Sequence, residues 1–213
     1  NYNMIVMKFG GTSVGSVESI RNIGALVKER QARHPLVITS AHGRDPEGRH
    51  DKMTDLLIGA ARNALKGKPD SSAIAARQLQ LVRDLGLEES LVSDLLESLA
   101  DLLKGISLVE ELTDRTLDQV QSFGERMAAR VLAAALRQDG VNAVAMDSYE
   151  LGLVTDARYG AASPNPDCYP EVAKRWRAVE ADVVISTGFI AQCPDGHITT
   201  LGRGGSDYSA TIF

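Results

Sequence analysis

The chain has 213 residues, of which 44% are hydrophobic, and a formal net charge of −5 at pH 7. This length can bury one substantial core, with or without an attached lobe. The acidic charge and the lack of a long basic run argue against nucleic acid as a partner. No apolar stretch approaches the roughly 20 residues that span a bilayer, and the first residues lack the charged-then-apolar order of a signal peptide. We therefore expect a cytoplasmic protein that binds neither nucleic acid nor membrane.

Short apolar runs alternate along the chain with helical patterns. Continuous apolar runs suit strands covered on both faces, so the pattern predicts an α/β fold with a mainly parallel sheet. Apolar residues at helical spacing predict a helix from about Val17 to Arg33, between the first two strands, and the middle of the chain, about 53–137, is predicted to be helical. The strand candidates are Met4–Phe9, Leu36–Ser40, Ala143–Asp147, Asp182–Thr187 and Ile198–Leu201.

The most loop-like stretches are 42–52 and 159–170. His42 and His50 in the first could suggest a metal pair, but we expect exposed loop histidines and predict no metal site. The only two cysteines, Cys168 and Cys193, lie in loop-like polar surroundings without CxxC spacing. A disulfide between them could form but is not needed, and metal ligation by them is not expected.

Two glycine turns follow strand candidates at opposite ends of the chain. Gly10 and Gly11 come directly after a strand that carries Lys8, and the second turn lies within Gly202–Asp207. Glycines let the backbone approach a ligand closely, and a following helix N-terminus offers N–H groups to an anion. Neither turn fits the dinucleotide fingerprint or the Walker A pattern. Together they predict one phosphate site of another kind, built from both ends of the chain.

Three segments resemble the motifs of aspartate kinases. Lys8–Val14 resembles their opening motif, Ser122–Met127 resembles their central Ser-x-Gly-Glu motif, and Gly188–Ile190 with Thr199–Ala210 resembles the segment that closes their aspartate pocket. The motifs occur in family order over almost the whole chain. The resemblance implies the three-layer amino-acid-kinase (carbamate-kinase-like) fold. It also implies transfer of the γ-phosphoryl group of ATP to the side-chain carboxylate of L-aspartate, giving 4-phospho-L-aspartate for lysine, threonine and methionine biosynthesis.

The resemblance also implies roles for single residues. Lys8 and Asp207 form the catalytic pair. Lys8 neutralises phosphate charge, and Asp207 orients the Lys8 side chain. Mg²⁺ is expected to arrive mainly on the ATP phosphates. The implied substrate-binding residues are Ser40, Thr54, Glu125, Phe189, Arg203 and Ser206. The implied phosphate-binding residues are Lys8, Gly10, Gly11, Gly204 and Gly205.

Simpler interpretations of these residues remain open from the sequence. Lys8 could be a surface lysine at a strand end, and Asp207 a helix cap. Ser122 and Glu125 fit the Ser-x-x-Glu capping box, which by itself would explain the glutamate. Phe189 could be an ordinary core residue.

Two features depart from the family pattern. A charged loop, about 42–53, precedes Thr54, which we take as the substrate-contacting threonine. The chain stops inside the helix expected after the second glycine turn. We therefore interpret 1–213 as part of a catalytic domain truncated at its C-terminus, namely the aspartate-binding lobe with a helical insert at about 53–137. Most of the nucleotide site and the regulatory ACT domains would then be absent, so we expect weak ATP binding and doubtful activity from these residues alone. The full-length protein is expected to be a homo-oligomer.

Other functions stay open at this point. The nearest is another enzyme of the same fold, which phosphorylates glutamate, acetylglutamate, UMP or carbamate. A second is a non-catalytic module that binds an amino acid without ATP chemistry.

Overall fold

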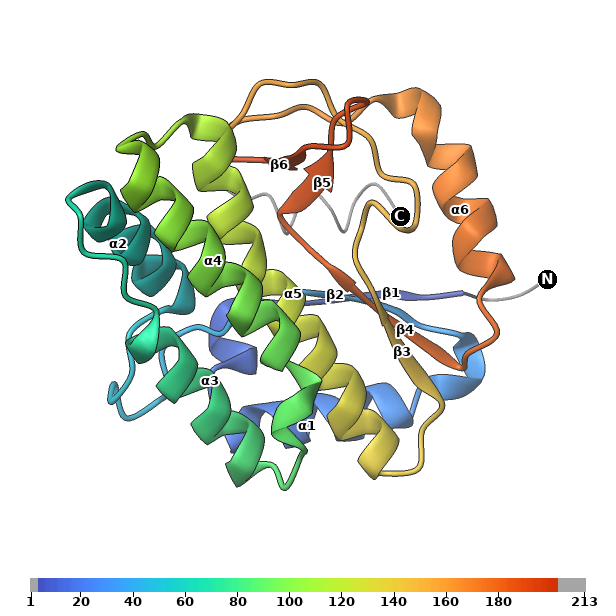
Figure 1. Ribbon diagram of the computed structural model, residues 1–213. Helices are drawn as coiled ribbons and strands as arrows, with labels where there is room; N and C mark the ends of the chain where they lie inside the picture. The colour runs from blue at the N-terminus through green and yellow to red at the C-terminus, as the bar shows by residue number, and fades with distance from the viewer. Residues whose placement is uncertain (1–3, 203–213) are drawn as a thin grey trace.

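The computed structural model describes residues 4–202, in which four parallel strands form the central sheet in the order β1-β2-β4-β3 (Figure 1). All four residues of β2 and all five of β4 are buried, as expected for central strands covered on both faces. The predicted parallel sheet is thus confirmed. The strands are β1 Val6–Phe9, β2 Leu36–Thr39, β3 Ala143–Met146 and β4 Val183–Thr187.

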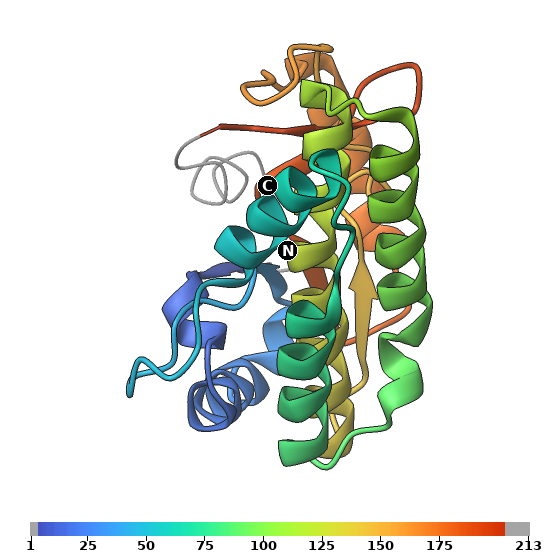
Figure 2. The ribbon, with the colours of Figure 1, turned by 60° about the vertical axis from the view of Figure 1, so that its left-hand side comes forward.

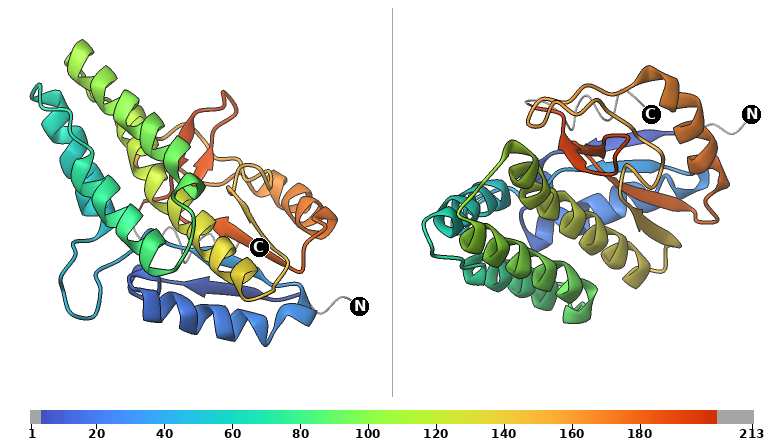
Figure 3. Two further views of the ribbon diagram at one scale, coloured as in Figure 1. Left: turned by 60° about the horizontal axis from the view of Figure 1, so that its bottom comes forward. Right: turned by 45° about the horizontal axis from the view of Figure 1, so that its top comes forward.

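Helices cover both faces of this sheet. Helices α1 (Val17–Lys28) and α5 (Asp114–Gln138) lie on one face, where they share a core with Val37 and Ile185 of the strands. Helix α6 (Tyr169–Ala178) covers the other face, where it packs on the alternate residues of the same strands. The two faces and their helices can be followed in Figure 3. The result is the expected three-layer α/β arrangement.

The middle of the chain is helical, as predicted. Helices α2 (Met53–Leu65), α3 (Ser72–Asp84) and α4 (Ser93–Val109) gather beside α5, to the left of the sheet in Figure 1. Their leucine-rich faces continue the core of α1 and α5, and α2 packs directly against α5. Figure 2 shows the loop between β2 and α2 projecting beyond these helices. Short 3-10 turns complete the fold: η1 Gly11–Val14, η2 Gln31–Arg33, η3 Glu89–Leu91 and η4 Pro166–Cys168.

Several details differ from the sequence prediction. The strand expected at the C-terminal end, β6 (Ile198–Thr200), does not join the main sheet but pairs antiparallel with β5 (Ile190–Gln192), a three-residue strand too short to predict. The first helix ends at Lys28 instead of continuing to Arg33. Helix α6 begins in a stretch predicted to be loop, because proline favours the first turn of a helix although it reads as a breaker elsewhere.

Two further findings concern cysteines and membranes. Cys168 and Cys193 are both free. Cys193 lies in the connection between β5 and β6, in agreement with its predicted loop-like position, but it is buried. Within residues 4–202, no helix is both long and apolar enough to cross a membrane.

Candidate active site

The ends of the parallel strands place five of the predicted site residues at one edge of the sheet. The register aligns Phe9 of β1 with Thr39 of β2, and Thr39 with Thr187 of β4. The residues that follow these three positions therefore meet at the carboxyl edge, where open α/β sheets bind their ligands. The predicted residues brought there are Lys8, Gly10, Gly11, Ser40 and Phe189.

The first glycine turn lies directly under the side chain of Lys8. Gly10 has an extended backbone and leads into η1, where the Ser13 amide donates to the Gly10 carbonyl over 3.1 Å. The Nζ atom of Lys8 lies 3.9 Å from the position that a Cβ atom on Gly10 would occupy. The ammonium and the turn backbone therefore border the same space, as a phosphate group requires.

Glu125 reaches this edge from the middle of α5. Its side chain is 2% exposed, and Oε1 accepts a 3.2 Å hydrogen bond from the Ala41 amide, which directly follows Ser40. Oε2 has no hydrogen-bond partner among the residues that the structure describes. Burial raises the pKa of Glu125 to about 8, although the bond from Ala41 opposes this shift. A buried carboxyl group with one free oxygen is suited to receive a cation.

The capping-box interpretation of Ser122 and Glu125 is wrong. Helix α5 begins at Asp114, and its N-cap is Thr113, whose side chain accepts from the Thr116 amide. Ser122 lies inside the helix and donates from its hydroxyl to the Gln119 carbonyl over 2.6 Å. Glu125 therefore caps no helix end.

Gly124 explains how α5 comes so close to the end of β2. A Cβ atom at this position would lie 2.8 Å from Cβ of Ala41 and 3.2 Å from Cδ1 of Leu57 in α2. The absence of a side chain thus allows the Ala41 amide to reach Glu125. A glycine inside a helical pattern was the signal in the sequence, since it indicates close packing when it is not a helix end.

Thr54 lies half-buried in the first turn of α2. The Met53 amide, which precedes it, donates to the His42 carbonyl over 2.9 Å, so the start of α2 is tied to the end of the β2 segment. The packing of α2 against α5 places the helix that carries Thr54 beside the helix that carries Glu125.

Phe189 adopts a left-handed backbone conformation, with φ of 65°. Its carbonyl accepts from the Leu201 amide over 2.9 Å, and the preceding Gly188 amide donates to the Thr39 carbonyl over 2.9 Å. Its side chain is half-buried, unlike the fully buried residues of β4. A non-glycine residue in this conformation carries strain that is characteristic of ligand sites.

The predicted residues of the second glycine turn lie outside the described residues. They are Arg203, Gly204, Gly205, Ser206 and Asp207.

The strand that leads to this turn is held by a residue that sequence reasoning missed. Asp118 of α5 is buried and accepts hydrogen bonds from the Gly160 amide (2.9 Å), the Thr200 amide (3.0 Å) and the Thr200 hydroxyl (2.9 Å). Burial nonetheless raises the pKa of Asp118 above its usual range.

His42 corrects another expectation. The sequence predicted exposed loop histidines, and His50 is exposed, but His42 is only 2% exposed. Desolvation lowers the pKa of His42 to about 4, so the ring is neutral near pH 7. Among the described residues, no group of three or more His, Cys, Asp or Glu side chains could hold a metal ion.

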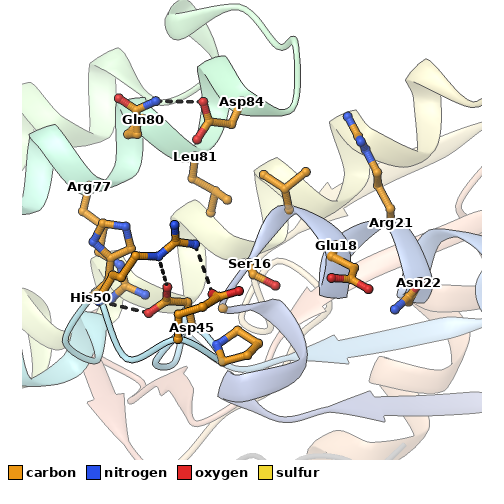
Figure 4. Close-up of a pocket in the computed structure, with 15 residues that line it drawn as sticks. Ser16, Glu18, Arg21, Asn22, Asp45, His50, Arg77, Gln80, Leu81 and Asp84 are labelled. Atoms are coloured by element: carbon orange, nitrogen blue, oxygen red, sulfur yellow. Dashed lines mark hydrogen bonds and ion pairs between the residues drawn. The ribbon is translucent and has the colours of Figure 1, made fainter.

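A cavity lies away from the candidate residues at the sheet edge. It has a volume of about 480 Å³ and lies between the start of α1, the 42–52 loop and α3 (Figure 4). Several of the polar groups that line it bond to one another: Arg49 donates to Asp45 and to Glu47, each over 3.0 Å, and Gln80 donates to Asp84. None of the predicted site residues lines this cavity, so it is not the candidate active site.

Comparison with known proteins agrees with this geometry. The family model described as the amino acid kinase family matches residues 3–213. The chain is 37% identical to Aspartokinase 1, chloroplastic, of Arabidopsis thaliana and 35% identical to Aspartokinase 2 of the same plant, over 97% of its own length in both cases. It covers 37% and 38% of those two relatives, so it spans less than half of their length.

Solved structures show the same similarity. E. coli aspartokinase III in complex with aspartate and ADP superposes with a TM-score of 0.80 at 28% identity, over 98% of this chain and 46% of that one. The same enzyme in complex with lysine and aspartate gives a TM-score of 0.83, also over 46% of its chain. On the extent of the family match and the shared fold, the chain belongs to the amino acid kinase family.

Proposed function

We propose that this chain carries the aspartate-binding part of an aspartate kinase, which transfers the γ-phosphoryl group of ATP to the side-chain carboxylate of L-aspartate. The observation that carries the proposal is the buried Glu125, whose Oε2 lacks a partner among the described residues at the edge where Lys8 and the first glycine turn also lie. The similarity to aspartokinases, one of them in complex with aspartate and ADP, supports the choice of substrate.

The acceptor needs no general base. The side-chain carboxyl group of aspartate has a pKa near 3.9 and is ionised at neutral pH, so one of its oxygens can attack the γ-phosphorus directly. The bond from the γ-phosphorus to the oxygen that bridges it to the β-phosphate breaks, and ADP leaves with that electron pair. The main barrier is the approach of two anions, so catalysis depends on positioning and on charge neutralisation.

Each part of this task has a candidate group. Lys8 and the amides around Gly10 and Gly11 would hold the phosphates, and Glu125 would receive the α-ammonium of aspartate. Arg203 would form a bidentate pair with the α-carboxylate, as the guanidinium geometry favours.

The remaining candidates complete the two half-sites. Ser40, Thr54, Phe189 and Ser206 would line the aspartate pocket, with Gly204, Gly205 and Asp207 on the phosphate side. Mg²⁺ would be bound mainly through the ATP phosphates. Assembly of the full-length protein as a homo-oligomer and a cytoplasmic location remain predictions.

The test is a titration of the 213-residue chain by calorimetry, with L-aspartate and with succinate, which lacks only the ammonium group. A coupled assay for ADP, with MgATP and either L-aspartate or L-glutamate, runs in parallel on the full-length protein. We expect L-aspartate to bind more tightly than succinate, and ADP to be released with aspartate and not with glutamate.

The outcomes separate the competing functions. Aspartate binding without ADP release or ATP binding by the full-length protein would indicate an amino-acid-binding module. Turnover of glutamate would identify another kinase of the same fold. Equal affinity for succinate and aspartate would remove Glu125 from the substrate site.

A further inference from the structure

The two segments that carry the phosphate-side and aspartate-side candidates touch each other backbone to backbone. The Gly43 amide donates to the Gly11 carbonyl over 2.7 Å. A Cβ atom on Gly43 would lie 2.6 Å from both the Gly11 carbonyl oxygen and the Thr12 amide nitrogen, and one on Gly11 would lie 3.1 Å from the Ala41 carbonyl oxygen. Beyond the paired strands β1 and β2, the close approach of the two segments therefore depends on the contacts around residue 43.

The buried side chain of His42 links the glycine turn to helix α3 through hydrogen bonds. Its Nδ1 atom lies 2.6 Å from the Val14 carbonyl at the end of η1, and its Nε2 atom lies 3.3 Å from Nε2 of Gln78 in α3. A carbonyl oxygen can only accept, so Nδ1 carries the proton, and Nε2 is left to accept from the Gln78 amide. Both nitrogens of the neutral ring are thus used, one toward the glycine turn and one toward α3.

Arg77, the neighbour of Gln78, holds the other side of the same segment. Its guanidinium donates to the carbonyls of Gly43 and Asp51, and the residue is 8% exposed. These two carbonyls lie near the two ends of the loop before α2. One turn of α3 therefore fixes both the start of this loop and its return toward Thr54.

We propose that His42 is a positioning residue, which, together with Gln78 and Arg77, sets the glycine turn that faces the phosphates against the segment that carries Ser40, the Ala41 amide and Thr54. The inference rests on the proposed function, because the two segments are the donor and acceptor sides of that reaction. His42 itself contacts backbone and Gln78, not the proposed substrates. Loss of the His42 side chain would shift the two half-sites relative to each other, while each half-site itself stays intact.

Such a displacement has a characteristic kinetic signature. Phosphoryl transfer requires in-line approach, and a misplacement of about 1 Å can cost about 100-fold in rate. The KM values for aspartate and ATP depend on contacts within each half-site. We therefore expect His42 variants to lose kcat by about 10- to 100-fold while both KM values stay within about 3-fold.

The variants separate the two hydrogen bonds of the ring. His42→Asn keeps a donor near the Nδ1 position for the Val14 carbonyl, whereas His42→Leu keeps neither bond. Gln78→Met removes the partner of Nε2 and also removes the Gln78 Oε1 atom, which has no partner among the described residues. Gln80→Met, at an exposed position of α3, is the matched control.

The experiment combines steady-state kinetics of the full-length protein with hydrogen exchange of the 213-residue chain, measured without substrates. The proposal predicts the largest loss of kcat for His42→Leu, a smaller loss for Gln78→Met and His42→Asn, and none for Gln80→Met. It also predicts faster exchange of the Gly43 and Met53 amides in the first three variants, with β4 amides unchanged. If the His42 variants lose exchange protection uniformly along the chain and keep their kcat, the proposal is overturned and His42 has a purely structural role. If only the KM for aspartate rises, His42 contacts the substrate, which would also overturn the proposal.

The exchange measurement keeps this inference separate from the proposed function. If the full-length wild-type protein does not phosphorylate aspartate, the proposed function fails and the inference is judged by exchange alone. Unchanged exchange at Gly43 and Met53 in His42→Leu would then overturn it, and a selective increase would support it.

Discussion

The Ala41 amide donates a 3.2 Å hydrogen bond to Oε1 of Glu125 and thereby joins the end of β2 to the middle of α5, 84 positions away in the chain. This single bond orients the carboxyl group, since its other oxygen has no partner among the described residues. The pKa of Glu125 stays high because burial outweighs the backbone donors that oppose it, of which the Ala41 amide is the largest.

The first prediction is that L-aspartate binding releases a proton from Glu125. With a pKa of about 8, roughly nine-tenths of the Glu125 side chains are protonated at pH 7. An ammonium group beside the carboxyl favours its ionised form and lowers the pKa. Calorimetry at pH 7 in two buffers of different ionisation enthalpy should show release of nearly one proton with aspartate and none with succinate. Glu125→Gln should abolish the release and weaken aspartate binding, whereas release that persists in this variant would come from another group.

The second prediction concerns the close contact at Gly124. Gly124→Ala would place a methyl group 2.8 Å from Cβ of Ala41, so the Ala41 segment and α5 must separate. We expect a loss of about 1–3 kcal/mol in the free energy of unfolding and a higher KM for aspartate. Gly59→Ala in α2 is the control, because nothing lies within 4 Å of the added methyl group and alanine should stabilise the helix by roughly 0.5–1 kcal/mol. Equal stability changes in the two variants, measured by urea denaturation, would contradict the packing argument.

The third prediction assigns Lys8 to the phosphoryl group. Lys8→Met removes the ammonium that borders the glycine turn, so transition-state charge is no longer neutralised. We expect kcat to fall by about 100-fold or more, with aspartate affinity little changed. Lys66→Met, an exposed lysine at the end of α2, should leave both parameters unaltered. An unchanged kcat in Lys8→Met would remove this residue from the mechanism.

The fourth prediction follows from the buried His42. Its folded-state pKa of about 4 lies below the usual 6.5, so the unfolded chain takes up a proton first as the pH falls. Stability is therefore lost between pH 6.5 and about 4, by about 2 kcal/mol between pH 7 and 5. The positive charge of Arg77 also lowers the pKa of His42 and so acts in the same direction.

Denaturation of wild type and His42→Asn at both pH values tests this prediction. The variant lacks the ionisable ring, and comparison with wild type removes the contribution of Glu125. The raised pKa of Glu125 makes stability fall as pH rises from 4.5 through about 8, the opposite direction. An equal pH dependence in the two proteins would show that His42 is not buried as the structure places it.

The sequence predicts those features that depend on local patterns. Buried apolar runs predict the four parallel strands, and the glycine turn after Lys8 predicts a site at their carboxyl edge. It does not predict the bond from Ala41 to Glu125, because any residue could supply that backbone amide. The charged loop around His42 favours exposure, whereas its actual partners are the Val14 carbonyl and Gln78, 28 and 36 positions away. These contacts follow from tertiary packing alone.

The last prediction concerns Asp118, which holds the strand before the second glycine turn. Its carboxylate accepts from the Gly160 amide and from the amide and hydroxyl of Thr200. Asp118→Ala leaves these buried donors unsatisfied, so we expect a loss of about 2–4 kcal/mol in the free energy of unfolding. In Asp118→Asn the remaining oxygen can still accept from both amides, and the new NH₂ group can donate to the hydroxyl oxygen of Thr200, so the loss should be much smaller.

The same variants test whether Asp118 serves the candidate site. Thr200 stands only three positions before Arg203 in the chain, so a displaced β6 should also weaken aspartate binding in Asp118→Ala. Calorimetry of folded protein measures this effect separately from stability. Asp101→Asn, at an exposed position in the middle of α4, is the control and should change neither quantity. A destabilised Asp118→Ala that binds aspartate as wild type does would limit Asp118 to a role in folding, because β6 would then not position the aspartate site.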